Sequence, residues 1–265
     1  MVILLQKILL EQIFDRFVIQ DCRHYWSWSR SWAWDSYCSC KTHGAKVALL
    51  GRTFDKVKKA SKNLNKEGLT TIAVECDVKH EESIDLAIEQ IISEFTTINV
   101  LINNAQEVPL GSVLEISEED FVSGWESGPL ATFRLMRKFH RFLENGGNIV
   151  NLASSAGLRP DSQGYGMYAA VKEAIRSITR AAAVEWGKDN IRVNSIMPLG
   201  NSVGMDWWVE NNPEESSAFI ETIPLKKVGD CEKDIGNAVC HLISDGMGYI
   251  TGTTIMIDGG QAYLR

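Results

Sequence analysis

The chain has 265 residues, of which 45% are hydrophobic, and its formal net charge at neutral pH is −7. This length and composition predict a single globular domain with a sizeable core. The acidic balance argues against a nucleic-acid partner, whose binding surface would normally be basic. No run of 18 or more apolar residues occurs, so we expect no membrane-spanning segment.

The first 19 residues are apolar but interrupted by charged side chains. They predict a short amphipathic helix or strand rather than a signal peptide. Six scattered cysteines are typical of reduced cytosolic thiols rather than of a disulfide framework. Cys38 and Cys40 lack a second pair at ligand spacing, so we expect no metal site. These features predict a cytoplasmic protein.

From Gly44 onward, short β-branched or apolar runs alternate with longer helical stretches. The expected strands are Val47–Leu50, Thr71–Cys76, Val100–Ile102, Asn148–Leu152, Arg192–Ile196 and Thr253–Ile257. The expected helices are Asp55–Glu67, Glu81–Phe95, Glu118–Leu143, Tyr165–Trp186 and Glu232–Ser244. This alternation predicts an α/β fold, with a doubly wound parallel sheet between two layers of helices. Ligands of such a sheet bind at the carboxyl ends of its strands.

Tyr168 and Lys172 lie four residues apart, on one face of the expected helix Tyr165–Trp186. A phenol has a pKa near ~10 and is a poor acid–base catalyst at neutral pH. An ammonium at about 4 Å contributes roughly 4 kcal/mol at an effective dielectric near ~20, enough to lower that pKa by about three units. Ser155, thirteen residues before Tyr168, could hold the oxygen that receives the proton. The trio predicts acid–base chemistry on a carbonyl or alcohol, although a tyrosine and a lysine at this spacing are more often a solvated helix pair.

Further motifs in the same order along the chain resemble the short-chain dehydrogenase/reductase family. They are Asp77-Val78, Asn103-Asn104-Ala105, the segment from Asn151 to Ser155, Tyr168 with Lys172, Pro198, Tyr249 to Gly252, and Asp258-Gly259-Gly260. The resemblance covers roughly residues 44–260 and implies a Rossmann-like fold.

The resemblance also implies roles for these residues. Tyr168 would exchange a proton with the substrate oxygen, and Ser155 would hydrogen-bond the same oxygen. Lys172 would acidify the phenol and bind the nicotinamide ribose. Asp77, Val78, Asn104, Ala105 and Pro198 would contact the cofactor, which supplies the hydride.

The second strand of the family's sheet indicates which nicotinamide cofactor is used. A carboxylate at its end would bond the ribose 2′-hydroxyl of NAD(H). Here Gly51 and Arg52 follow instead, and Arg52 could pair with a 2′-phosphate, so we favour NADP(H) over NAD(H). The alternative is that Arg52 is a solvated turn residue.

The sequence departs from the family pattern at three single positions. Gly128 stands where an asparagine usually helps to hold a proton-relay water, and Pro129 would kink the helix there. Gln106 replaces the glycine that usually follows Asn-Asn-Ala, and Leu199 replaces the glycine after Pro198.

A fourth departure is larger, because the glycine-rich phosphate loop expected before Gly44 is missing. Its place is taken by a segment in which Trp26, Trp28, Trp32 and Trp34 fall within nine residues. Indoles cannot replace glycines where backbone approaches a pyrophosphate. The tryptophan codon TGG, read one base later, always encodes glycine, so we interpret residues near 21–43 as an out-of-frame translation. The alternative is a genuine aromatic insertion that binds a partner.

The segment between Pro198 and Pro224 is the family's variable substrate loop. Met205, Trp207 and Trp208 line an apolar substrate pocket in one interpretation and cover the core or an interface in the other. The C-terminal segment resembles one through which family members assemble, which predicts a homodimer or homotetramer. Two functions remain open: an oxidoreductase acting on a small carbonyl or secondary alcohol, and a non-catalytic relic or oligomeric binding protein that no longer binds the dinucleotide.

Overall fold

The computed structural model describes residues 2–4, 18–20, 46–143, 146–158, 164–201 and 203–262. Six parallel strands form most of one sheet: β3 (Lys46–Gly51), β4 (Thr70–Glu75), β5 (Val100–Asn103), β6 (Asn148–Leu152), β7 (Arg192–Pro198) and β8 (Thr254–Ile257). All six match the expected strands to within two residues. The tryptophan-rich segment and the frameshift interpretation of residues 21–43 lie outside the described residues.

The sheet changes winding direction between β3 and β5. Strand β4 pairs with β3 on one side, while β5, β6, β7 and β8 follow one another on the other side. Two three-residue strands, β1 (Val2–Leu4) and β2 (Val18–Gln20), each pair with both β3 and β5; β1 is parallel and β2 antiparallel to them. Of the forms expected for residues 1–19, the described parts are therefore strand. A reversal of this kind is where open α/β sheets bind ligands.

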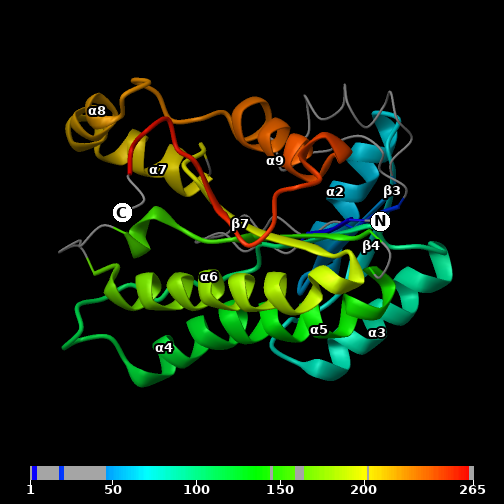
Figure 1. The fold of residues 1–265 in the computed structure, drawn as a ribbon. Coiled ribbons are helices and arrows are strands. Elements are labelled where there is room, and N and C mark those ends of the chain that lie inside the picture. The colour runs from blue at the N-terminus through cyan, green and yellow to red at the C-terminus, as the bar shows by residue number, and fades with distance from the viewer. Residues whose placement is uncertain are drawn as a thin grey trace.

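Helices cover both faces of the sheet (Figure 1). One layer contains α3 (Glu81–Glu94), α4 (Glu118–Trp125), α5 (Ala131–Leu143) and α6 (Gly166–Trp186). The other contains α2 (Phe54–Lys66), α7 (Val203–Asn211), α8 (Pro213–Thr222) and α9 (Asn237–Ile243). The predicted three-layer, doubly wound architecture is confirmed.

The core divides into two clusters because successive strand residues face opposite layers. Ala48 and Leu50 of β3 join the cluster beneath α3 and α5, with Ile84 and Phe139 among its members. Val47 and Leu49 join the cluster beneath α2 and α9, which includes Val57 and Val239. The same alternation recurs in β5 and β6, so each strand buries both of its faces.

Four elements differ from the expected helices. The helix expected over residues 118–143 is interrupted by a π-helical turn, η1 (Glu126–Leu130), which contains Pro129. Proline cannot donate the helical backbone bond, which accounts for the break. A second π-helical turn, η4 (Cys231–Gly236), precedes α9. The helices α7 and α8 lie in what we expected to be a variable loop, and Pro213 occupies the first turn of α8, where it is well tolerated.

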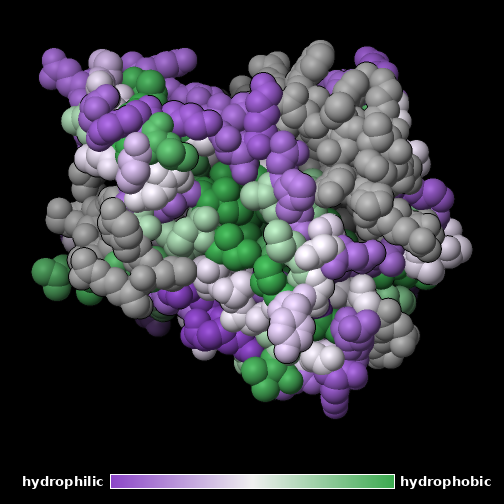
Figure 2. Space-filling model, turned by 45° about the horizontal axis from the view of Figure 1, so that its top comes forward, coloured by the Kyte–Doolittle hydropathy of each residue, from purple (hydrophilic) through white to green (hydrophobic). Residues whose placement is uncertain are grey.

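Buried polar contacts tie the carboxyl end of β6 to its neighbours. The Asn103 Nδ2 donates to Asn151 Oδ1 at 2.8 Å, and Asn151 Nδ2 donates to Thr179 Oγ1 on α6, also at 2.8 Å. These two bonds connect β5, β6 and α6 through the Asn151 side chain. Figure 2 shows a central hollow lined by hydrophobic side chains and bordered by hydrophilic ones on the face turned forward. Within the described residues, no helix combines the length and hydrophobicity that a membrane crossing requires.

Candidate functional site

Lys172 lies almost fully buried, 3% exposed, on the side of α6 that faces β6. Its Nζ donates to the Leu152 carbonyl at 2.7 Å and lies 5.6 Å from the centroid of the Tyr168 ring. The last backbone carbonyl of β6 therefore holds the lysine against the tyrosine. The structure brings the predicted pair together at the carboxyl edge of the sheet.

Tyr168 is partly buried, and its hydroxyl hydrogen-bonds the side chain of Ser154. Its ring packs edge-on against Tyr165, with 6.2 Å between centroids. Burial raises the pKa of Tyr168 to about 12; the bond to Ser154 acts in the opposite direction, and Tyr165 adds to the increase. The phenol is therefore protonated throughout the physiological range.

The serine beside the phenol is Ser154, whereas the sequence spacing pointed to Ser155. Ser154 precedes the short 3-10 helix η2 (Ser155–Gly157), and its Oγ also accepts from the Ala156 backbone N at 3.2 Å. Ser155 is the first residue of η2. Two adjacent serines leaving a strand point in different directions, and counting residues does not show which one faces the helix.

The pKa of Tyr168 shifts in the direction opposite to the one that we expected, because of burial. We expected the ammonium to lower the pKa of Tyr168, but burial dominates and raises it. Burial also lowers the pKa of Lys172 to about 7, because removing an ammonium from water favours its neutral form. The pair consists of a protonated phenol beside a lysine that is about half protonated near pH 7.

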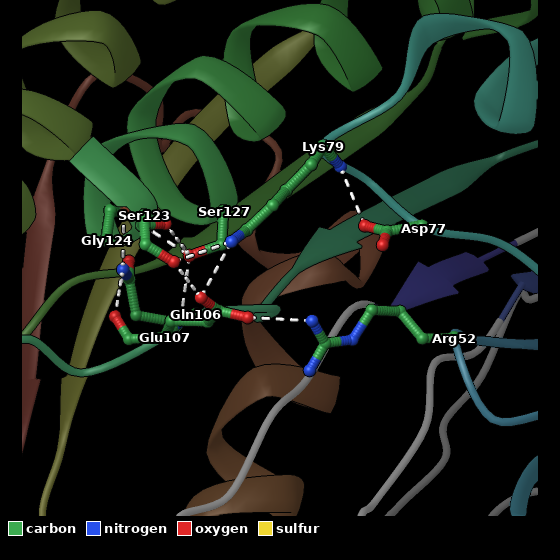
Figure 3. Close-up of polar contacts among 8 residues, drawn as sticks. All are labelled: Arg52, Asp77, Lys79, Gln106, Glu107, Ser123, Gly124 and Ser127. Carbon is green, nitrogen blue, oxygen red and sulfur yellow. Dashed lines mark hydrogen bonds and ion pairs between the residues drawn. The ribbon is translucent and has the colours of Figure 1, made fainter. Parts of the chain in front are cut away.

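A second polar cluster lies where β3, β4 and β5 end (Figure 3). Arg52 Nη1 lies 2.8 Å from Glu107 Oε1, and Lys79 Nζ lies 2.7 Å from Glu107 Oε2. Lys79 also donates to Ser123 Oγ at 2.6 Å, and that hydroxyl donates to Glu107. Lys79 and Glu107 were not predicted site residues. A lone charged residue in a loop carries no signal of its own, so only the fold reveals the cluster.

Gln106 and Gly128, two of the departures from the family pattern, fit one another. The Gln106 Nε2 donates to the Gly124 carbonyl at 2.8 Å and to the Glu107 carbonyl at 2.7 Å. A Cβ on Gly128 would lie only 2.2 Å from Gln106 Oε1. The larger side chain at position 106 therefore occupies the space that the missing side chain at position 128 leaves open. Gln106 Oε1 is buried and has no hydrogen-bond partner among the described residues.

The other predicted cofactor residues also lie along this edge of the sheet. Asp77 Oδ1 accepts from the Lys79 backbone N at 3.0 Å, and Val78 is buried beside it. Ala105 is buried just beyond β5, and Pro198 is the last residue of β7.

The described residues fit a dinucleotide. The Asn104 Nδ2 is a buried donor with no partner among the described residues. Such a donor, together with the cations of the second cluster, suits the polar groups of a nucleotide at this edge. The expected pyrophosphate loop lies outside the described residues.

The remaining candidates differ in burial and packing. Trp208 packs edge-on against Phe219, which holds α7 to α8, whereas Trp207 is 56% exposed. Cys240 is buried in the core. The described residues contain no group of three or more metal-ligating side chains, and Cys38 and Cys40 lie outside them.

Comparison with known proteins gives consistent matches over most of the chain. The family model described as enoyl-(acyl carrier protein) reductase matches residues 28–262. The 12α-hydroxysteroid dehydrogenase of a Clostridium species is 37% identical over 225 residues, which cover 82% of this chain and 86% of that protein.

Solved structures with bound cofactors also resemble this fold. The L-sorbose reductase of Gluconobacter frateurii, in complex with NADPH and L-sorbose, is 26% identical with a TM-score of 0.74. The match covers 82% of this chain and 87% of the reductase chain. An NAD⁺-bound xylitol dehydrogenase is 27% identical with a TM-score of 0.75 and covers 81% and 88%.

The complementary packing of Gln106 and Gly128 predicts a non-additive response to mutation. Gly128→Ala should lower the free energy of unfolding in urea by ~1–3 kcal/mol, because its Cβ must displace the Gln106 carboxamide. In a Gln106→Ala background the same change should be nearly neutral. Gly187→Ala is the matched control, since a Cβ there meets nothing within 4 Å. Equal losses in both backgrounds would refute the complementarity.

The lowered pKa of Lys172 predicts a stability difference that depends on pH. Between pH 7 and about 10 the unfolded chain holds this proton and the folded chain does not, so the free energy of unfolding rises with pH. Relative to Lys172→Met, the parent should gain about 1.4 kcal/mol per pH unit in that window. Urea unfolding at several pH values measures it. Lys59→Met, which removes an exposed lysine, is the control. A constant gap would mean that Lys172 titrates normally.

Proposed function

The chain belongs to the short-chain dehydrogenase/reductase family, and from that membership we propose that it is a single-domain oxidoreductase that interconverts a small carbonyl and a secondary alcohol. The proposal rests on two contacts of Tyr168. Its hydroxyl hydrogen-bonds the side chain of Ser154, and the Lys172 Nζ lies 5.6 Å from the centroid of its ring. A bound nicotinamide cofactor supplies or accepts the hydride.

We propose that Tyr168 gives a proton to the substrate oxygen during reduction. With a pKa of about 12 the phenol carries its proton at neutral pH and can donate it as negative charge develops on that oxygen. Ser154, which already bonds the phenol, can hydrogen-bond the same oxygen. Lys172, held by the Leu152 carbonyl, can stabilise the phenolate that remains when it is protonated. In the oxidative direction the phenol must first lose its proton, so the rate of oxidation should rise with pH.

We propose NADP(H) as the cofactor, in preference to NAD(H). Arg52 directly follows β3 where a carboxylate would be needed to bond a 2′-hydroxyl, and Lys79 adds a second cation nearby. The structural relatives include one with NADPH and one with NAD⁺, so the preference rests on these two side chains. Asp77, Val78, Asn104, Ala105 and Pro198 are the other proposed contacts.

We propose that the substrate enters on the side of α7, where Met205 and the exposed Trp207 supply apolar surface. The hydrophobic hollow in Figure 2 supports an apolar substrate. We also propose a cytoplasmic homo-oligomer assembled through the C-terminal segment, since β8 lies at the end of the sheet and its residues stay partly exposed. A monomeric mass in analytical ultracentrifugation would refute the assembly.

Replacing Tyr168 by Phe tests the proposed function directly. The change removes the hydroxyl and keeps the ring, so turnover should fall at least ~100-fold while the Kd for NADPH stays within about twofold. Fluorescence titration with NADPH and NADH measures binding, and a panel including L-sorbose and an oxidised 12α-hydroxysteroid measures turnover. Retained turnover would exclude Tyr168 as the acid. If neither cofactor binds saturably at millimolar concentration, the non-catalytic alternative is favoured.

The neighbouring serines provide a matched pair of variants. Ser154→Ala should lower kcat by about tenfold or more, because it removes the hydroxyl that contacts Tyr168. Ser155→Ala, one residue further along, should change kcat by no more than about twofold. Ser154→Ala also removes the hydrogen bond from the Ala156 backbone N. Thermal unfolding of both variants measures how much this loss lowers stability, separately from its effect on kcat. The reverse order of effects would restore Ser155 as the functional serine.

A further inference from the structure

The cluster of Arg52, Lys79 and Glu107 lies at the point where the sheet changes winding direction. Arg52 follows β3 and Glu107 follows β5, and these two strands flank that point. The 2.8 Å contact between Arg52 and Glu107 therefore spans the position at which a dinucleotide would cross the strand ends. Figure 3 shows the two side chains reaching toward one another from separate loops.

The Glu107 carboxylate has the set of partners that a phosphate group would need. One oxygen contacts the Arg52 guanidinium; the other contacts the Lys79 ammonium and the Ser123 hydroxyl. Two cations and a hydroxyl donor converging on one anion are typical of phosphate recognition. The side chains are partly screened from solvent: Glu107 is 16%, Lys79 18% and Arg52 38% exposed.

The backbone of Glu107 is held in place by two hydrogen bonds. Its N donates to Ser127 Oγ at 2.8 Å, and its carbonyl accepts from Gln106 Nε2 at 2.7 Å. These bonds fix where the side chain begins without fixing its rotamer. A rotation of the side chain would move the carboxylate away from the two cations.

From these contacts we propose that Glu107 is an internal anion that occupies the 2′-phosphate subsite between Arg52 and Lys79 and weakens the binding of NADP(H). The inference rests on the proposed function, because it takes the ligand to be a nicotinamide dinucleotide. A phosphate can use both cations only after Glu107 moves away. The Asp77 carboxylate, which bonds the Lys79 backbone, leaves the four residues with no net charge while Glu107 is ionised. An uncharged 2′-hydroxyl requires no such exchange, so Glu107 lowers discrimination in favour of NADP(H).

An ordinary structural ion pair is the competing explanation. Partly exposed pairs contribute little to stability, typically below about 1 kcal/mol. Under this explanation, the loss of the pair would leave the preference between nucleotides unchanged. The two explanations differ in what Glu107→Gln does to the affinity for a 2′-phosphate, because the substitution keeps the side-chain shape and removes the charge.

The test compares two adenine nucleotides by isothermal titration calorimetry. Glu107→Gln should bind adenosine 2′,5′-bisphosphate about tenfold more tightly than the parent, while the affinity for adenosine 5′-monophosphate stays within about twofold. Adding Arg52→Ala should abolish the gain. Asp85→Asn, which removes a carboxylate paired with Lys138 at 2.6 Å between α3 and α5, is the matched control and should change neither affinity.

An equal change for both nucleotides, no gain for the bisphosphate, or no measurable binding of the bisphosphate to Glu107→Gln would each overturn the inference. Titration of the same proteins with NADPH and NADH separates this result from the proposed function. A parent that binds NADPH, with no gain in Glu107→Gln, refutes only the role of Glu107. A gain for the bisphosphate in a protein that binds neither dinucleotide refutes only the proposed function.

Discussion

The placement of the proposed catalytic residues depends on the burial of Lys172 under the first turns of α6. An ammonium that is only 3% exposed is unfavourable unless a good acceptor compensates it, and the Leu152 carbonyl at 2.7 Å is that acceptor. The bond joins α6 to the end of β6, next to the point where Ser154 leaves the strand. The same desolvation lowers the pKa of Lys172 and raises that of Tyr168. One packing constraint thus determines both the positions and the protonation states of these residues.

Complementary changes explain how the fold accommodates two of its departures from the family pattern, Gln106 and Gly128. Gln106, in the loop after β5, has a large side chain that fills the space beside Gly128 in η1, where a side chain is lacking. The carboxamide also bonds the carbonyl of Glu107, so the same substitution that fills the space steadies the residue that pairs with Arg52 and Lys79. The loop that contains Gln106 therefore packs against the π-helical turn η1 and also positions Glu107 of the charged cluster at the strand ends.

The two halves of the sheet edge differ in their electrostatics. Around Tyr168 and Lys172 the environment is desolvated, and the neutral forms of both groups are favoured. Around Arg52, Lys79 and Glu107 the charged forms neutralise one another near solvent. Such a division suits a ligand with an uncharged reactive group at one end and an anionic group at the other. It agrees with the nucleotide-dependent chemistry that the family membership implies.

The sequence by itself determined the order and type of the main elements. The spacing of apolar residues along each run indicates whether it forms a strand or a helix. For this reason the six parallel strands were predicted to within two residues. The Tyr168–Lys172 pair was also predictable, because a spacing of four places both residues on one face of a helix. Helices α7 and α8 were missed, since their expected loop was judged by its variability in the family rather than by its pattern.

Only the tertiary structure decided which serine meets the phenol, which direction the tyrosine pKa takes, and which carboxylate pairs with Arg52. These are contacts between residues on different elements, or effects of burial, and no periodicity in the chain encodes them. Ser154 and Ser155 are chemically identical in sequence and differ only in where β6 ends. Glu107 meets Arg52 across 55 residues because parallel strands bring their carboxyl ends to one edge.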